Sequence, residues 1–455
     1  MKSLAIALAV AVSCGSFMYR VQAQAPAPEQ LINLQAFEDL LQAPSRGLTS
    51  GLVLTLGDAE RIALEQNPQI AIATRRVAVA EAHLPIAGTL DDPSAMYRGW
   101  GVPLRQPWDF NQAQNMFSLS QTFPGKGKRA LRTSVAQSDV DVAKAELAET
   151  RLEVQVRVRK AFNDLLLADE ETKIHEGHVG IARQAIEAAR IKYAVGKVSQ
   201  QDVLKAQLAM TALAEHMIRF DRDAGVARAR LNTLLGRDPA CSLQVKGQFS
   251  ATFPLPALET LEEVAVQSRP DLEVARDAAD RSHKQEALAN KAYLPDFTVS
   301  GGYSLMPPNV SMRNSYMIEG SMNLPWLNRR KHNAEVAAAS AAAVEQETES
   351  DALRTAAFGQ IGEALAQAKA AQRFARLYQD QLRPQAEATL QSSVVAYEND
   401  RTDFLNLLNS QMEVIDVELE WAQAMADFDS RLADLELAVG AEISQLQQTA
   451  TEVKP

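Results

Sequence analysis

The spacing of apolar positions predicts two very long helices. Residues 126–194 contain no proline, and their mostly apolar positions follow an alternating four- and three-residue spacing that is typical of packed helices. The positions in this spacing are Leu131, Val135, Ser138, Val142, Ala145, Glu149, Leu152 and Val156. About 70 residues with a rise of 1.5 Å each predict a rod of about 100 Å. Residues 329–397 contain one proline and are dense in alanine, so close packing between neighbouring rods is expected.

Four short segments alternate between apolar and small polar residues, which predicts β-strands. The clearest is residues 297–305, which is followed after a turn by residues 316–324. In the first half of the chain, residues 117–123 alternate in the same way, and residues 94–102 do so less regularly. Each run is about nine residues long, the length of a tilted membrane-spanning strand with lipid on one face and water on the other.

The segment 94–102 is the weakest of these strands, because Arg98 shares a face with Met96 and Trp100. Four strands cannot close a barrel, and unpaired strand edges are not tolerated in lipid. A membrane location would therefore require several copies of the chain. The alternative interpretation of the same alternation is a pair of soluble β-hairpins that cap a helical bundle.

The order of elements occurs twice along the chain, at an offset of about 200 residues, which indicates an internal repeat. Residues 67–70 recur as 269–272, and Gly236 recurs as Gly440. Both hairpins are followed by basic clusters, which are Lys126, Lys128 and Arg129 in the first copy and Arg329, Arg330 and Lys331 in the second. The predicted fold class is mainly α with a small β part, built from duplicated long α-helical hairpins and four β-strands.

The repeat divides the chain into segments. We expect two structural repeats, each composed of a helix, a β-hairpin, a long helix, a tip and a final helix, joined by a linker. The segments are a signal peptide at 1–23, an N-terminal linker at 24–53, the first repeat at 54–240 with its hairpin at 94–123 and its tip near residue 196, an inter-repeat linker at 241–257, the second repeat at 258–440 with its hairpin at 296–324 and its tip near residue 400, and a C-terminal tail at 441–455.

Composition and charge narrow the class further. The formal net charge of -11 argues against binding nucleic acid through its phosphates. Lys2 and the apolar run at residues 4–12 have the pattern of an export signal. The apolar run is too short to span a bilayer. Cleavage after Ala23 and lipidation at Cys14 are the two interpretations of its processing. No later apolar run is long enough for a helical membrane span, so entry into a membrane would have to use the strands.

The duplicated order of elements, together with two sequence motifs, resembles the TolC family of outer-membrane efflux channels over residues 54–440. The motifs are the strand exit at 121–124 with the basic residues after it, and the segment 193–199 that leads to Asp202 and Gln207. The resemblance implies a homotrimer that forms a twelve-stranded transmembrane β-barrel, continued by an α-helical tube into the periplasm. It also implies a periplasmic adaptor (membrane fusion protein) and an inner-membrane transporter of the RND type as partners, and outer-membrane lipids around the barrel.

The resemblance further implies which residues meet the adaptor and form the gate. The tips that match the family's adaptor contacts are Gly196, Lys197, Val198 and Ser199, and Asp400, Arg401 and Thr402. The family's acidic gate positions fall on Asn406 and Asn409, a departure from the acidic pattern, while Asp403 lies one turn before Asn406. Two roles for Asp403 stay open: an acidic ring in the channel, or only the N-cap of the last helix.

No arrangement typical of an enzyme is found in the sequence, and no cofactor is expected. His175 and His178 could share a metal on one helix face, but a solvated face is the preferred interpretation. The predicted function is a passive exit duct of a tripartite efflux system in the outer membrane. The basic motif favours the heavy-metal efflux branch, with CzcC-like or CusC-like channels. A type I secretion duct and a soluble periplasmic coiled-coil scaffold are the alternatives.

Overall fold

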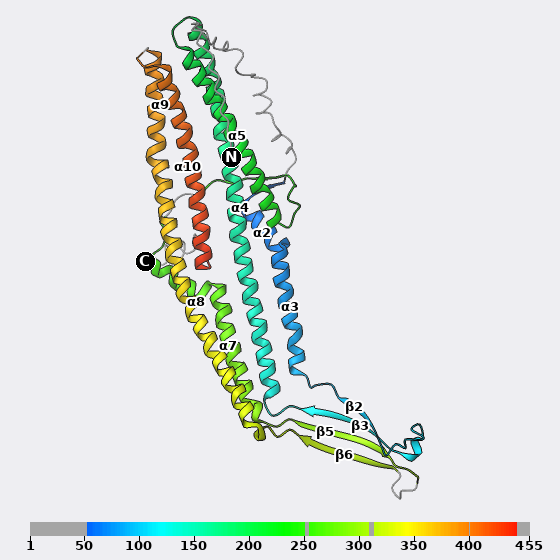
Figure 1. Ribbon diagram of the computed structural model, residues 1–455. Helices are drawn as coiled ribbons and strands as arrows, with labels where there is room; N and C mark the ends of the chain where they lie inside the picture. The colour runs from blue at the N-terminus through cyan, green and yellow to red at the C-terminus, as the bar shows by residue number, and fades with distance from the viewer. Residues whose placement is uncertain (1–51, 251–253, 309–313, 400, 444–455) are drawn as a thin grey trace, which may run out of the picture.

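A computed structural model describes residues 52–250, 254–308, 314–399 and 401–443 of the chain. Long helices form a rod, a β-sheet lies at one end of the rod, and two helix tips lie at the other (Figure 1). The signal peptide predicted at residues 1–23, including Cys14, lies outside the described residues. Within the described residues, no helix is both long and apolar enough to cross a membrane.

The two repeats are built from helices of matching length. α2 (Leu56–Gln66) and α6 (Leu258–Ser268) have 11 residues each, and α3 (Pro68–Gly88) and α7 (Pro270–Asn290) have 21 each. α3 and α7 both begin with proline, whose missing N–H costs nothing at the first turn of a helix.

The predicted long helices are present. α4 (Lys128–Ala194) has 67 residues and is followed by α5 (Gln200–Leu234). In the second repeat, α8 (Arg329–Leu377) leads through a π-helical turn (Tyr378–Leu382) into α9 (Arg383–Glu398), and α10 (Phe404–Val439) ends the repeat. The π-turn ends two residues before Pro384, which cannot donate the regular backbone hydrogen bond and whose ring clashes with the preceding turn.

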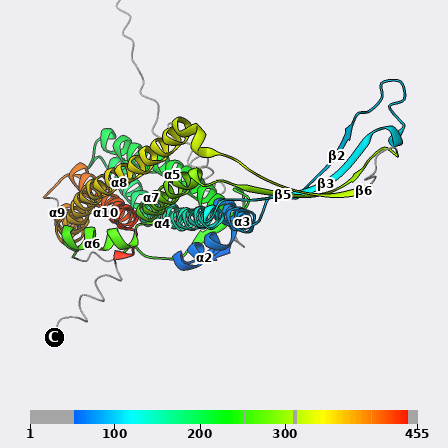
Figure 2. The same ribbon diagram turned by 90° about the horizontal axis from the view of Figure 1, so that it is seen from below.

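The four predicted strands form one antiparallel sheet rather than two separate hairpins. Its order is β2 (Ser94–Trp100), β3 (Gln114–Phe123), β5 (Phe297–Leu305) and β6 (Asn314–Met322). β3 pairs with β5 along nine residues, so the hairpins of the two repeats join edge to edge. The sheet extends sideways from the helices (Figure 2).

One face of this sheet is apolar and the other is polar. The register places Tyr97, Phe117, Tyr303 and Tyr316 in one row across all four strands, and cross-strand neighbours share a face. On the opposite face, the hydroxyls of Thr122 and Thr298 lie 3.0 Å apart, and those of Ser94 and Ser120 lie 2.7 Å apart.

The register corrects the prediction for the first strand. Met96 and Arg98 lie on the face that carries Ser118 and Ser120 of β3, opposite the aromatic row of Tyr97 and Phe117. The apolar face of β2 is instead formed by Ala95 and Tyr97. Alternation within the segment could not decide between the faces, because Tyr97 and Arg98 are adjacent and both are long side chains with a polar end.

Two further strands were not predicted. β1 (Leu52–Leu54) pairs in parallel with β4 (Leu243–Val245), and the Lys246 N–H donates to the Leu54 carbonyl at 2.8 Å. β4 falls in the segment expected to be the inter-repeat linker, 241–257, and β1 crosses the expected boundary between the linker 24–53 and the first repeat. Strands of three residues are too short to show a period, and their pairing is remote in sequence.

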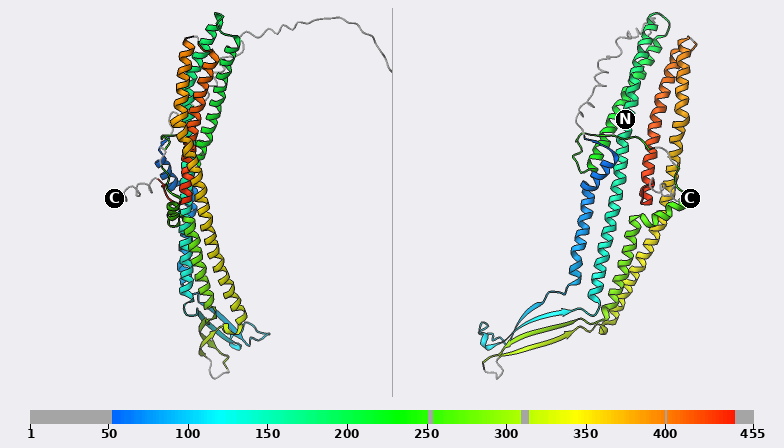
Figure 3. Two further views of the ribbon diagram at one scale, coloured as in Figure 1. Left: turned by 90° about the vertical axis from the view of Figure 1, so that its left-hand side faces the viewer. Right: turned by 180° about the vertical axis from the view of Figure 1, so that it is seen from behind.

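The core is divided among clusters along the rod. Each repeat has its own apolar cluster where its first helix meets its long helices, around Ala63 and Leu231 in the first and Ala265 and Leu435 in the second. Toward the tips, one cluster is shared by both repeats, because Phe404 and Ile415 of α10 pack with residues of α4 and α5. Figure 3 shows the hairpins α4/α5 and α9/α10 side by side at this end.

The last helix of each repeat closes onto that repeat's own first helical junction. Asn67 Nδ2 donates to the Leu234 carbonyl at 2.8 Å, and at the corresponding place Arg269 Nη1 donates to the Ala438 carbonyl at 2.9 Å. The chain then turns at Gly236 and Gly440, which have φ angles of 69° and 79°. A β-carbon would lie 2.6 Å from the Gln66 carbonyl oxygen at Gly236, and 2.7 Å from that of Ser268 at Gly440.

These two glycines should be intolerant of substitution. We expect Gly236→Ala and Gly440→Ala each to lower the free energy of unfolding by about 2 kcal/mol or more, because the left-handed backbone and the close carbonyl both oppose a side chain. The control is Gly359→Ala in α8, where an added β-carbon meets no atom within 4 Å. That variant should gain about 0.5–1 kcal/mol in thermal or denaturant unfolding. Equal effects at all three positions would contradict the requirement for glycine at residues 236 and 440.

Candidate functional site

The first tip is a tight turn between α4 and α5. The Gly196 N–H donates to the Tyr193 carbonyl at 2.9 Å and the Lys197 N–H to the Lys192 carbonyl at 2.8 Å, an arrangement that requires the positive φ of 73° at Gly196. Ser199 starts α5 through a capping box with Asp202. The predicted tip residues 196–199 therefore do form the turn, and Gly196, Lys197 and Ser199 are exposed.

The second tip lies between α9 and α10. Asp400 is outside the described residues, and the Arg401 N–H donates to the Ala396 carbonyl at 2.8 Å. Asp403 is the N-cap of α10, since its Oδ1 accepts the Asn406 N–H at 2.9 Å. Thr402 Oγ1 accepts from Asn406 Nδ2 at 3.2 Å. Asp403 therefore has the N-cap role, which is one of the two roles that the sequence left open.

Asp403, Asn406 and Asn409 are exposed in the single chain, while the neighbouring Phe404 is buried. Phe404 packs into the cluster shared by both repeats and so fixes the start of α10 beneath the tip. The three predicted gate residues thus lie at one end of one helix, with their side chains available to solvent or to another chain.

Polar contacts connect the two helical hairpins below the tips. Lys192 Nζ lies 3.6 Å from the centre of the Tyr397 ring, a cation–π contact between α4 and α9. Farther down, Gln423 Nε2 donates to Glu171 Oε1 at 2.8 Å, and Asn163 Nδ2 donates to the Ala426 carbonyl at 2.7 Å. The first contact therefore joins α4 to α9, and the other two join α4 to α10.

His178 contributes the central contact of this series. Its Nε2 lies 2.8 Å from Glu418 Oε2, and its Nδ1 lies 3.2 Å from Gln411 Nε2. Because an amide nitrogen can only donate, Nδ1 accepts and the Nε2–H donates to Glu418. This hydrogen bond holds the pKa of Glu418 below its usual value.

His175 has different partners, which corrects the expectation of a solvated pair. It is fully buried, and its Nε2 lies 3.1 Å from Nδ1 of His216 on α5. Burial lowers the pKa of His175 to about 4, so the ring is neutral near neutral pH. His175 thus faces α5 whereas His178 faces α10. Among the described residues, no group of three or more histidine, cysteine or acidic side chains is placed to hold a metal.

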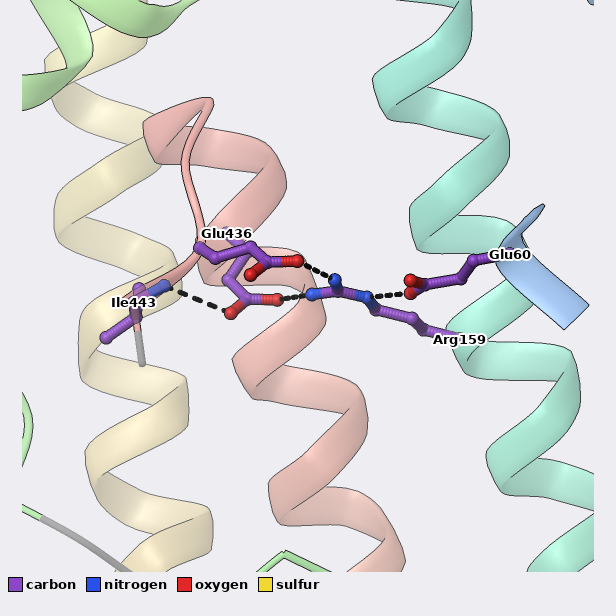
Figure 4. Close-up of polar contacts among 5 residues, drawn as sticks. Glu60, Arg159, Glu436 and Ile443 are labelled. Atoms are coloured by element: carbon purple, nitrogen blue, oxygen red, sulfur yellow. Dashed lines mark hydrogen bonds and ion pairs between the residues drawn. The ribbon is translucent and has the colours of Figure 1, made fainter. Parts of the chain in front are cut away.

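At the lower end of α10, Arg159 joins the two repeats. Its guanidinium pairs with Glu60 of α2, Glu436 of α10 and Glu442, and Glu436 Oε1 also accepts the Ile443 N–H at 3.1 Å (Figure 4). One cation therefore faces three carboxylates in a largely buried position, and burial raises the pKa of Glu436. Ile443 is buried as well, so the segment predicted as a tail from residue 441 begins inside the fold.

The sequence pattern gives no sign of the contacts that Arg159 makes. Arg159 lies among several basic residues on a long helix, and its three partners are 99, 277 and 283 positions away. A local pattern carries no information about pairs so far apart. Only the fold brings Glu60, near the start of the first repeat, together with Glu436 and Glu442, near the end of the second.

Comparison with known proteins gives this architecture a family. The family model described as outer membrane efflux protein matches residues 61–237 and 261–441, which correspond closely to the two repeats. The chain belongs to the outer membrane efflux protein family. It is similar to cobalt-zinc-cadmium resistance protein CzcC of Cupriavidus metallidurans, with 24% identity over 65% of this chain and 69% of that protein.

Other proteins are similar to this chain in sequence or in structure. Nodulation protein T of Rhizobium leguminosarum is 24% identical over 83% of this chain and 84% of its own length. Among solved structures, CusC superimposes with a TM-score of 0.73 at 16% identity, covering 87% of this chain and 96% of CusC. The outer-membrane channel OprN superimposes with a TM-score of 0.71 at 17% identity, covering 85% of this chain and 90% of OprN.

In this outer membrane efflux protein, Arg159→Gln should be strongly destabilising. Three carboxylates would then face one another without a cation, and we expect a loss of about 3 kcal/mol near neutral pH. The unpaired carboxylates would have raised pKa values in the folded state, so the folded state would bind more protons than the unfolded one. The loss should therefore shrink as the pH falls from about 7 to about 5.

The matched control is Arg157→Gln, on the same helix, where the exposed Arg157 pairs with the exposed Glu153 at 3.4 Å. That variant should change the free energy of unfolding by less than about 0.5 kcal/mol at either pH. Unfolding curves of both variants at two pH values provide the measurement. A pH-independent loss in Arg159→Gln would show that the carboxylates do not repel one another.

Proposed function

We propose that the chain is the passive exit duct of a tripartite efflux system, acting as a homotrimer in the outer membrane. The observation that carries this proposal is the sheet. It has an apolar and a polar face and is joined directly to the long helices. Three copies would supply twelve strands, enough to close a barrel with lipid outside and water inside. Closure would pair the outer strands β2 and β6 of neighbouring copies and leave no edge in lipid.

The helices would continue the duct into the periplasm. At 1.5 Å per residue, the 67 residues of α4 make a rod of about 100 Å. The end of the helical rod that lies away from the sheet carries the tips 196–199 and 401–402. We propose these tips as the contacts for a periplasmic adaptor and, through it, an inner-membrane transporter of the RND type. The inner-membrane partner would supply the energy, and this chain would make or break no bond.

Heavy-metal cations are the proposed substrate class. The support is the similarity to CzcC and to nickel-cobalt-cadmium resistance protein NccC, which is 22% identical over 55% of this chain. Asp403 is an exposed carboxylate three residues before the candidate gate position Asn406. Repeated in three copies, it would form an acidic ring that favours cations, in addition to its role as a cap.

The duct itself is tested by cell fractionation and by migration on gels with and without heating. Recovery in the outer membrane as a heat-sensitive trimer is expected. A soluble monomer in the periplasm would overturn the proposal in favour of a coiled-coil scaffold.

The acidic ring is tested with Asp403→Asn, because asparagine still caps a helix but carries no charge. In planar bilayers, the ratio of cation to anion permeability should fall by about twofold or more. The control is Asp202→Asn in the first turn of α5, where the carboxylate closes a capping box with the N-cap Ser199. Unchanged reversal potentials in Asp403→Asn would leave Asp403 with the capping role alone.

A further inference from the structure

Basic residues gather where the sheet meets the helices. The connections at this end, residues 89–93, 124–132, 291–296 and 323–332, hold eight basic and three acidic side chains, although the whole chain has a net charge of -11. The positive charge is thus concentrated in one zone. It comes from both repeats, since the two basic clusters follow corresponding strand exits.

These segments are close in space. Asp296 accepts from both the Gly125 N–H at 2.7 Å and Lys128 Nζ at 2.8 Å, which ties the start of α4 to the start of β5. The Tyr293 hydroxyl donates to Asn333 of α8, and the Tyr293 and His332 rings are 5.6 Å apart. The roots of α4, β5 and α8 therefore form one continuous surface.

Most of the basic side chains in this zone lack a partner. Lys128 is paired with Asp296 and Lys331 with Glu335. Of the other six, Arg132 interacts electrostatically with Asp296. The last five are Lys126, Arg129, Lys291, Arg329 and Arg330, which we call the basic collar. All five are exposed, and within the described part of the chain none of them forms an ion pair.

The two helices that start here add to the positive potential. α4 and α8 begin without a side-chain cap, and both carry basic residues in the first turn. The N-terminus of a helix already has a partial positive charge, so cations at this position are unfavourable unless an anion is nearby. The tips differ in this respect, because Ser199 and Asp403 cap their helices with oxygen atoms.

An apolar band adjoins the basic collar. The last row of the sheet places Phe123, Phe297 and Met322 side by side on the apolar face, all exposed. Trp326 and Leu327, directly before Arg329, are exposed as well, Leu327 to 76%. Aromatic residues followed by cations match the boundary between acyl chains and head groups in a bilayer, whereas a free anion in water would need no apolar neighbour.

We propose that the basic collar binds the phosphate groups of anionic phospholipids in the leaflet that faces the helices, an inference that rests on the proposed membrane location. The exposed aromatic row contacts the acyl chains, and the five cations contact the head groups. The lipid thereby neutralises the charge at the roots of α4 and α8 and holds the junction of sheet and rod at the membrane surface.

The test is a native mass spectrometry titration of the purified protein with short-chain phosphatidylglycerol and phosphatidylcholine. The unchanged protein should prefer phosphatidylglycerol, and Arg329→Gln/Arg330→Gln should weaken phosphatidylglycerol binding by about tenfold. The matched control is Arg75→Gln/Arg76→Gln, which changes an exposed arginine pair on α3 and should leave lipid binding unchanged. Unfolding temperatures of both variants show whether they are folded.

Three results would overturn the inference: no preference in the unchanged protein, an equal loss in both variants, or displacement of the lipid by millimolar inorganic phosphate, which would indicate a simple anion site. Conductance in bilayers of phosphatidylcholine alone separates this inference from the proposed function. If Arg329→Gln/Arg330→Gln conducts there as the unchanged protein does, the duct stands whatever the lipid preference. If the unchanged protein does not insert or conduct, the proposed function itself fails.

Discussion

The pairing of β3 with β5 is the interaction on which the rest of the arrangement depends. Each repeat alone contributes a two-stranded ribbon, which is marginally stable in water. The β3–β5 ladder joins these ribbons into a sheet of four strands with two distinct faces. It also sets the start of α4 beside the start of β5, which follows α7, and Lys128 and Asp296 form an ion pair across this junction. The register between β3 and β5 therefore sets how the two repeats join at the sheet end of the molecule.

The packing between the long helices changes along the length of the rod. In the middle of the rod, each repeat has its own apolar cluster, whereas near the sheet α4 of the first repeat packs against α7 of the second. Toward the tips, one apolar cluster is shared, and polar contacts such as the one between His178 and Glu418 connect α4 with α10. Polar contacts have fixed directions and distances, so they define how the hairpins align, while the small apolar side chains between them allow close approach.

The sequence predicted the elements better than their contacts. The limits of α4 and β5 followed from a proline-free helical period and from strict alternation, both of which are local properties. The parallel pair β1 and β4 has too few residues for a period, and the apolar face of β2 was decided by Phe117 across the ladder. Arg159 and His175 looked like ordinary helical residues, because the carboxylates and the imidazole they meet come from distant segments.

The closure of each repeat on itself has a consequence for symmetry. The contact between Asn67 and Leu234 corresponds to the one between Arg269 and Ala438, so each half of the chain closes on itself in the same way. The halves differ in side chains and in the π-helical turn that only the second contains among the described residues. Three copies of the chain would then form a ring of six similar units. Such a ring has exact threefold symmetry and only approximate sixfold symmetry. Differences between the halves, such as Ser199 at one tip and Asp403 at the other, would make alternate positions of that ring distinguishable to a partner.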